Sequence, residues 1–367
     1  MTAASTLRQY AAVTGAYWAF TITDGALRML VLLYFYTRGY SALEVASLFL
    51  LYEFFGIVTN LFGGWLGARI GLARALHLGM LLQVVALLML TAPEAWLTVP
   101  YVMVSQALSG IAKDLSKTSA KSSVKLLVPD SDQAGLFKWI AVLTGSKNAL
   151  KGLGYFLGSI MLAAFGLAGS VLLMAAAIFA TLLVMLFLLP GQLGKSTYRP
   201  KFSHVFSKSA AINILSAARL FLFAARDTWF VIALPVYLQA ELGWSFASVG
   251  GFLALWIIGY GLVQSLTPGL LKAREQGASR GLAELLAFAL AVAMFGLAAS
   301  LHTSIEAGTA LMAGLAIFGV IFALNSSFHS YLVVSLARRD GVSLDVGFYY
   351  MANAAGRLLG TVLSGAL

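Results

Sequence analysis

Four lysines stand four residues apart in one stretch of a chain that otherwise contains few charges. The stretch "SGIAKDLSKTSAKSSVK" runs from residue 109 to residue 125 and carries Lys113, Lys117, Lys121 and Lys125. In an α-helix this spacing drifts by about 40° and rises by about 6 Å per step, so Lys113, Lys117 and Lys121 form one stripe. Ammonium groups attract oxyanions, and a stripe of them could form a basic path for an anion.

The same stripe could instead anchor a helix in a membrane, with long stems along lipid and charged heads at the interface. We interpret Lys121 and Lys125 in this way, and both interpretations stay open for Lys117. Lys113 lies too deep in its apolar segment for anchoring, and the neighbouring Asp114 could neutralise it. We nevertheless include Lys113 and Lys117 among the residues predicted to bind the anion, because both lie deeper in the apolar segment than Lys121 and Lys125.

Lys147 and Lys151 repeat this spacing in "GSKNALKG", at the middle of another apolar segment. Neither end of the segment is within easy reach of their ammonium groups, so anchoring explains them poorly. The glycines around them are Gly145, Gly152, Gly154 and Gly158. Such small surfaces permit close helix packing or leave room for a ligand, and packing is the expected role of Gly158. We expect Lys147 and Lys151 to bind the anion.

Further charges fall near the middle of apolar segments, where a charge costs roughly 2.5–3.5 kcal/mol and usually faces a partner or a watery cavity. They are Asp24, Arg28, Glu53, Arg226, Asp227 and, slightly beyond the middle, Arg357. Asp24 and Arg28 stand in the acid-first i, i+4 order, so an ion pair within one helix competes with a functional role. Arg226 and Asp227 should point about 100° apart, so we expect them not to neutralise each other across one face.

Cations outnumber acids in this interior set. The eight cations are Arg28, Lys113, Lys117, Lys147, Lys151, Arg219, Arg226 and Arg357, and the four acids are Asp24, Glu53, Asp114 and Asp227. Arg219 could also be an anchor at the cytoplasmic end of its segment. Because an unpaired cation is unfavourable in a low dielectric, this balance indicates a multiply charged anionic cargo. Arg28, Arg226 and Arg357 are predicted to clamp it, since guanidinium forks bind oxyanions bidentately.

The interior acids are candidates for proton coupling. Glu53 has no basic residue three or four positions away, so cargo arrival could change its proton occupancy and drive proton antiport. Asp24 and Asp227 are further candidates. The alternative for Glu53 is a permanent ion pair with an interior arginine or lysine.

The composition places these charges in an all-α membrane protein. Of 367 residues, 60% are hydrophobic and 10% are charged, whereas soluble domains carry about 25% charged residues. The chain has no cysteine and no His/Cys cluster, so we expect no metal and no cofactor. It also lacks the catalytic spacings of an enzyme. We attribute the net charge of +10 to cytoplasmic loops and expect no nucleic-acid partner.

Eleven apolar runs approach the roughly 20 residues that a membrane-spanning helix needs. They are predicted near residues 10–37, 41–66, 75–92, 97–118, 133–165, 168–190, 209–239, 245–271, 279–301, 304–335 and 343–367. The last run is still apolar at Leu367, so we expect twelve spans in the complete protein, with the C-terminal half truncated here.

Lysines and arginines gather in alternate connections, which predicts a cytoplasmic N-terminus. The longest hydrophilic stretch follows the sixth run. We therefore predict an N-terminal transmembrane half at 1–190, a central cytoplasmic loop at 191–208 and a C-terminal transmembrane half at 209–367.

The two halves resemble each other weakly. Asp24, Tyr34 and "GYSALEV" are echoed by Asp227, Tyr237 and "GWSFASV". A repeat of six spans fits the two-fold relation of one large transporter class, in which the substrate binds between the halves near the midplane.

The stretch "GGWLGARIGLAR" (residues 63–74) resembles the cytoplasmic loop signature of the major facilitator superfamily. The matching residues are Gly64, Leu66, Arg69, Gly71 and Arg74, while Ala68 stands where the signature has an acid. The resemblance implies two six-helix halves that work by alternating access.

Longer stretches are similar to the ArsJ group of bacterial organoarsenical efflux permeases: "YWAFTITDGALRMLVLLYFYTRGYS", "LLYEFFGIVTNLFGGWLGARIGL", "QALSGIAKDLSKTSAKSSVKLLVP" and "LFKWIAVLTGSKNALKGLGYFLG". This resemblance covers essentially the whole chain. It implies efflux of 1-arseno-3-phosphoglycerate across the bacterial inner membrane and arsenate resistance. It also implies a functional link to the glyceraldehyde-3-phosphate dehydrogenase that makes this ester in the cytoplasm. The ester's two oxyanion groups match the excess of cations in sign and rough size.

Other functions compete with this one. A carrier for another phosphorylated metabolite, such as a sugar phosphate, would use a basic cavity equally well. An anion channel would need rings of cations, usually from an oligomer, whereas the two-half organisation favours a monomeric carrier in the lipid bilayer. A membrane-embedded enzyme is the least favoured class.

Overall fold

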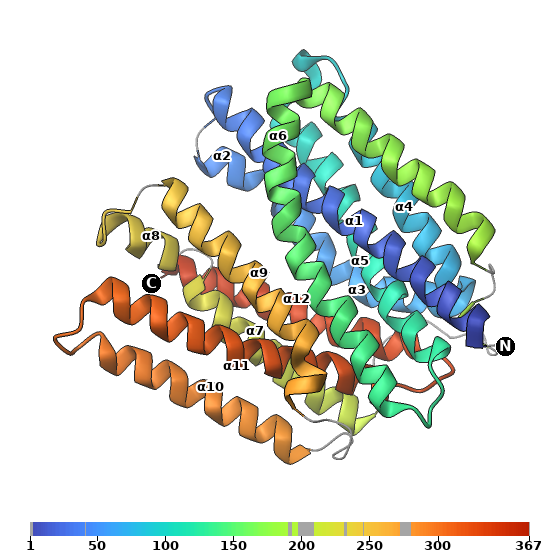
Figure 1. Ribbon diagram of the computed structural model, residues 1–367. Coiled ribbons are helices and arrows are strands. Elements are labelled where there is room, and N and C mark those ends of the chain that lie inside the picture. Colours follow the sequence, from blue (N-terminus) through green and yellow to red (C-terminus); the bar gives the residue numbers. More distant parts are fainter. Residues whose placement is uncertain are drawn as a thin grey trace. The chain divides into compact units, whose positions relative to one another are not determined.

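The computed structural model describes residues 3–40, 42–189, 193–196, 209–230, 233–244, 246–271 and 280–366. Across these ranges every regular element is a helix, which confirms the all-α prediction (Figure 1). The α-helices are α1 (Ala3–Thr37), α2 (Ala42–Ser47), α3 (Leu50–Ile70), α4 (Leu72–Met89), α5 (Val99–Leu127), α6 (Gln133–Leu188), α7 (Ala210–Phe230), α8 (Ala233–Ala240), α9 (Phe246–Leu270), α10 (Arg280–Ser300), α11 (Ala307–Leu336) and α12 (Val342–Ala366). A short 3₁₀ helix, η1 (Glu94–Trp96), precedes α5.

Each predicted apolar run coincides with helix, although helices and runs do not correspond one to one. The run at 41–66 contains α2 and most of α3, and the run at 209–239 contains α7 and most of α8. Conversely, α6 covers two runs and bends between them at Gly166, whose φ of 64° is a conformation that glycine adopts readily.

Among the residues that the structure describes, seven segments are long and apolar enough to cross a membrane by length and composition. They are 8–37, 72–89, 133–188, 210–240, 251–270, 281–300 and 307–336. The lysine-rich α5 is not among them because its charges lower its hydropathy. The contacts of the charged side chains on α5 are therefore described first below.

The chain packs into two compact units. The first unit comprises Met1–Pro129, Leu150–Leu220 and Leu336–Ala355. The second unit comprises Asp130–Ala149, Phe221–Ser335 and Gly356–Leu367. Four long helices, α6, α7, α11 and α12, contribute to both units. The division of the chain into sequential halves at 1–190 and 209–367 stays a prediction.

In the first unit, α5 packs against α1, α3 and α4 (Figure 1). Small residues let neighbouring backbones approach. A Cβ on Gly158 of α6 would lie 2.3 Å from the carbonyl oxygen of Ala26 in α1, so the packing role expected for Gly158 is confirmed. A Cβ on Gly64 of α3 would likewise lie 2.3 Å from the carbonyl oxygen of Ser343 in α12. Any larger side chain at either position would push the two helices apart.

In the second unit, aromatic side chains from α7, α9 and α11 form the core. The rings of Trp256 and Tyr260 stack with centroids 5.7 Å apart, and Trp229 meets Phe318 edge to face at 5.0 Å. The Trp256 indole donates a hydrogen bond of 2.9 Å to the carbonyl of Leu315. These contacts fix the faces of α7 and α9 that carry the polar residues described below.

Candidate functional site

One buried carboxylate, Asp114, serves two lysines of the stripe on α5. Lys117 forms a hydrogen-bonded ion pair with Asp114, and the Lys113 ammonium lies 3.7 Å from the second carboxylate oxygen. The Lys113 nitrogen also lies 3.8 Å from the ring centroid of Tyr52. The suggestion that Asp114 neutralises Lys113 is confirmed, with the addition that Lys117 shares the same acid.

The two charges of α1 find their partners on α3. Arg28 donates a hydrogen bond of 2.7 Å to Glu53, and its guanidinium carbon lies 5.0 Å from the ring centroid of Tyr52. Asp24 accepts a hydrogen bond of 2.6 Å from the Tyr52 hydroxyl. Arg28 therefore pairs with Glu53 on another helix and not with Asp24 on its own helix. This contact is the ion pair that the sequence analysis gave as the alternative role of Glu53. The roles of Glu53 and Asp24 in proton coupling stay predictions.

The interfacial position expected for Lys121 and Lys125 is wrong. Lys121 is 2% exposed and Lys125 is 6% exposed. Lys121 donates a hydrogen bond to the hydroxyl of Tyr350 in α12. The physical reason is that α5 is packed among other helices, so the stripe that would face lipid on a peripheral helix faces protein here.

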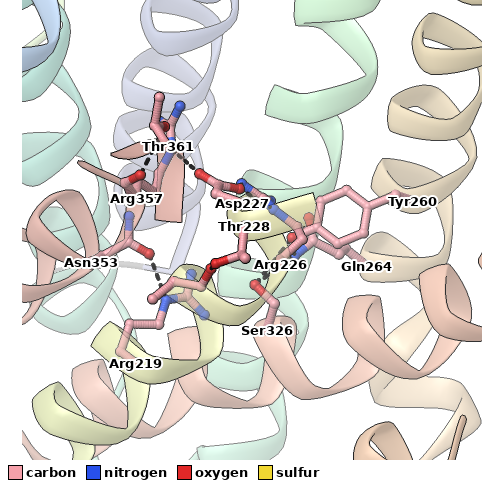
Figure 2. A network of polar contacts seen from close by, with 11 residues as sticks. Arg219, Arg226, Asp227, Thr228, Tyr260, Gln264, Ser326, Asn353, Arg357 and Thr361 are labelled. Carbon is pink, nitrogen blue, oxygen red and sulfur yellow. Dashed lines mark hydrogen bonds and ion pairs between the residues drawn. The ribbon is translucent and has the colours of Figure 1, made fainter. Parts of the chain in front are cut away.

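Arg219 of α7 is buried as well, at 3% exposure, which rules out the anchoring alternative. Its Nε donates a hydrogen bond of 2.8 Å to the side-chain oxygen of Asn353 in α12 (Figure 2). Its guanidinium carbon lies 5.3 Å from the ring centroid of Tyr349. Lys121 and Arg219 therefore both belong to the buried charges of the protein interior.

In the second unit a single acid, Asp227, joins two arginines. Arg226 donates to it from Nε at 2.6 Å, and Arg357 of α12 donates to its other oxygen at 3.2 Å (Figure 2). The expectation that Arg226 and Asp227 do not neutralise each other is wrong, because the long arginine side chain folds back along the helix to its neighbour. Arg226 also lies 4.6 Å from the Phe223 ring centroid, so an aromatic surface supports its guanidinium.

A chain of neutral polar side chains lies in the same unit. Asn148 of α6 donates a 2.6 Å hydrogen bond to Gln264 of α9. Gln264 in turn donates to the Tyr260 hydroxyl at 2.8 Å and to Ser326 of α11 at 3.2 Å (Figure 2). The sequence analysis did not select these residues. Amide side chains inside apolar runs could have drawn attention to this chain, but a buried amide indicates a functional site less strongly than a buried charge does.

Lys147 and Lys151 lie on consecutive turns of α6 and are half-buried. Lys147 belongs to the second unit and Lys151 to the first. Lys151 acts electrostatically on Tyr155, one turn further along, and so does Arg28 of α1. Their predicted role as anion ligands stays a prediction.

The loop signature forms the turn between α3 and α4. Gly71 turns the chain with a φ of 100°, and its N–H donates to the carbonyl of Gly67 at 3.0 Å. Gly64 accepts a hydrogen bond of 2.7 Å from the Ser343 hydroxyl, and Arg69 stacks over Trp65 at 5.1 Å. Arg74 is exposed at the start of α4.

A short strap from the central loop covers this turn. The N–H of Leu72 donates to the carbonyl of Leu193 at 2.7 Å, and the N–H of Ser196 donates to the carbonyl of Ala68 at 2.9 Å. The Ser196 hydroxyl donates to Asp340 at 2.7 Å. The backbone at Ala68 is thereby held although its side chain offers no charge.

Comparisons with known proteins agree with this architecture. The family model described as Major Facilitator Superfamily matches residues 13–361. The fold is similar to the proton:xylose symporter XylE, with a TM-score of 0.69 at 14% identity, over 97% of this chain and 87% of that one. It is also similar to a bacterial homologue of the iron transporter ferroportin in its outward-facing state, with a TM-score of 0.75 at 14% identity, over 98% and 92% of the two chains.

The human organic anion transporter TETRAN is similar too, with a TM-score of 0.71 at 13% identity, over 97% of this chain and 92% of that one. No curated protein sequence matches the chain. At these identities the solved structures show the fold alone, and the predicted fold of the major facilitator type is confirmed.

Proposed function

The chain belongs to the Major Facilitator Superfamily and is a multi-pass membrane protein with the fold of alternating-access secondary transporters, and from this premise we propose that it exports a multiply charged organic anion. The cargo that we propose is 1-arseno-3-phosphoglycerate. Its efflux from the cytoplasm would confer resistance to arsenate. The N-terminus is proposed to face the cytoplasm of a bacterial inner membrane, and the carrier is proposed to work as a monomer.

The observation that carries this proposal is that two buried acids, one in each unit, each pair with two cations. Asp114 is shared by Lys113 and Lys117, and Asp227 is shared by Arg226 and Arg357. One carboxylate cannot neutralise two cations, so each of these two groups of three side chains carries more positive than negative charge. Positive charge away from water is stabilised by an anion that binds beside it.

The chemistry of the ligands supports an oxyanion as cargo. Ammonium and guanidinium groups suit phosphate and arsenate, and the chain has no thiol for trivalent arsenic. Arsenate rather than phosphate is supported by the resemblance of the first five spans to organoarsenical permeases. The same cations would also serve another phosphorylated metabolite, and transport of one in place of the arsenate ester would favour that second candidate.

Replacing Lys147 or Lys151 with alanine is expected to abolish arsenate resistance while membrane expression stays intact. Each substitution removes an ammonium group from the middle of the part of α6 that precedes the bend at Gly166, and we assign this group to the cargo's oxygens. The measurement is growth in arsenate of cells that carry each variant and also produce the dehydrogenase. Lys138→Ala is the matched control, because Lys138 is an exposed lysine on the same helix. Wild-type resistance in both variants would remove these lysines from the site.

Replacing Glu53 with glutamine is expected to leave the exchange of cargo across the membrane intact but to abolish the accumulation of cargo that a pH gradient drives. We propose that Glu53 takes a proton from outside and releases it inward, where the ionised carboxylate pairs with Arg28 again. Glu53→Gln should then still exchange labelled for unlabelled cargo across vesicle membranes but lose accumulation driven by a pH gradient. Intact pH-driven accumulation would show that Glu53 is not the proton carrier, and loss of folded protein would assign the Arg28–Glu53 pair to stability.

A further inference from the structure

We propose that Lys121, Arg219, Tyr350 and Asn353, with Tyr17 beside them, form a subsite in the first unit for one tetrahedral oxyanion group of the cargo. This proposal rests on the proposed anion transport and deepens it. The group is a phosphate or arsenate ester that carries about −1.5 to −2 charges. The sequence had placed Lys121 in the interface and had left Arg219 undecided.

The first step is the burial of Lys121 without a counter-ion. Its side chain is almost completely enclosed, and its ammonium donates to the neutral hydroxyl of Tyr350. In the part of the chain that the structure describes, no carboxylate lies within 4.0 Å of this ammonium. A buried ammonium is tolerated only with good partners, and one hydroxyl leaves its charge uncompensated.

Neighbouring cations make the charge of Lys121 still less favourable. Arg219 and Lys117 both repel it. Lys117 is balanced by Asp114, and Arg219 donates from its Nε to the neutral amide of Asn353. Lys121 on α5 and Arg219 on α7 thus each donate to a neutral polar side chain of α12, Tyr350 and Asn353 respectively. An anion is the group that would lower the energy of this arrangement.

Tyr350 joins the cations through its ring as well as its hydroxyl. The nitrogens of Lys117 and Lys121 each lie 4.8 Å from its ring centroid. Its oxygen accepts a hydrogen bond from Lys121, which polarises the phenol and makes its own hydrogen a better donor. Tyr350 therefore holds Lys121 in place through both its ring and its hydroxyl.

Tyr17 supplies an independent sign that a ligand belongs here. Its side chain is 2% exposed, and its hydroxyl has no hydrogen-bond partner among the described residues. It belongs to the same unit as Tyr350 and interacts electrostatically with Tyr350, Asp114 and Asp24. A buried hydroxyl without a partner is unfavourable, and an oxyanion would accept its hydrogen.

The test combines thermal unfolding with ligand binding on the full chain in detergent. Lys121→Met is expected to unfold at a higher temperature than wild type without ligand, because the uncompensated ammonium is gone. It should bind the probe, 3-phosphoglycerate, at least about tenfold more weakly. A structural role for Lys121 would give the opposite shift in stability and leave the affinity unchanged, and that result would overturn the proposal.

Asn353→Asp provides a second variant that keeps the size of the side chain. The new carboxylate should bond Arg219 and occupy the charge that the oxyanion would neutralise, so probe affinity should fall by about tenfold or more while the protein stays folded. Lys138→Met is the control for charge loss on an exposed surface. Probe affinity in Asn353→Asp equal to that of wild type would also contradict the subsite.

Further arms separate this subsite from the function on which it rests. Inorganic phosphate and arsenate, titrated alone, show whether the subsite prefers one oxyanion, and either preference agrees with the proposal. Transport of the arsenate ester by Lys121→Met at the wild-type rate and affinity would refute the subsite and leave the proposed function intact. Failure of the wild-type protein to bind any of these oxyanions would refute the subsite, whereas failure of the wild-type protein to transport the arsenate ester would refute the proposed function.

Discussion

Replacing Asp227 with alanine is expected to lower the free energy of unfolding by about 3–5 kcal/mol and to abolish transport. Asp227 is 0% exposed and accepts hydrogen bonds from Arg226 and Arg357. Without the acid, two guanidinium groups in the second unit lose their common counter-charge. Removing one partner of a buried ion pair is costly because the remaining charge is uncompensated, and here two charges remain.

The measurement is thermal or denaturant unfolding of the purified variant in detergent. Glu241→Ala is the control, because Glu241 is an exposed acid of the same unit that directly follows α8. The double variant Asp227→Ala with Arg357→Gln should regain part of the lost stability, since it removes one stranded cation. If Asp227→Ala is as stable as the control, the two arginines do not depend on this acid.

Exchanging each clamp arginine for lysine is expected to weaken transport at least about tenfold at every position, which corresponds to about 1.4 kcal/mol of lost binding free energy. The positions are Arg28, Arg226 and Arg357. Lysine keeps the positive charge but cannot present two parallel N–H groups to an oxyanion. The charge balance with Glu53 and Asp227 is preserved, so the folded protein should remain.

Vesicle transport measured over a range of cargo concentrations would check this expectation. Arg38→Lys is the matched control, because Arg38 is exposed and pairs with Glu94 at the end of the first span. If transport survives all three exchanges unchanged, the arginines are structural and the cargo is bound elsewhere.

The helices could be predicted from the sequence because their signal is local. Runs of apolar residues define the spans, and Gly166 marks the break that divides α6. The close packing at Gly158 was also predictable, since a glycine on a helix face permits close approach. These features depend on residues near one another in the chain.

The partners of the charges could not be predicted because they come from distant segments. Arg28 pairs with Glu53 on another helix although Asp24 stands at favourable spacing on its own. Lys121 reaches Tyr350 across 229 positions of sequence. Spacing tells which side of a helix a residue occupies, but whether that side meets lipid or protein is decided by tertiary packing.

The pairing of Arg226 with Asp227 was not predicted for a different reason, although the two residues are adjacent in the chain. The backbone directions of adjacent residues diverge, which was the basis of the expectation, but an arginine has enough rotatable bonds to return to its neighbour. The direction of Cβ is therefore a weak guide for long side chains. Arg357 binds the other oxygen of Asp227 from a distant helix, so the spacing of residues on α7 could not predict that this acid is shared.

Uptake into inside-out membrane vesicles tests the central claim most directly. The dehydrogenase, glyceraldehyde 3-phosphate, NAD and radioactive arsenate are supplied outside the vesicles, so that 1-arseno-3-phosphoglycerate forms at the cytoplasmic face. We predict that label accumulates only when the complete mixture is present. Labelled arsenate alone and labelled 3-phosphoglycerate should not accumulate. Comparable uptake of all three compounds, or no uptake above that of vesicles without the protein, would contradict the account.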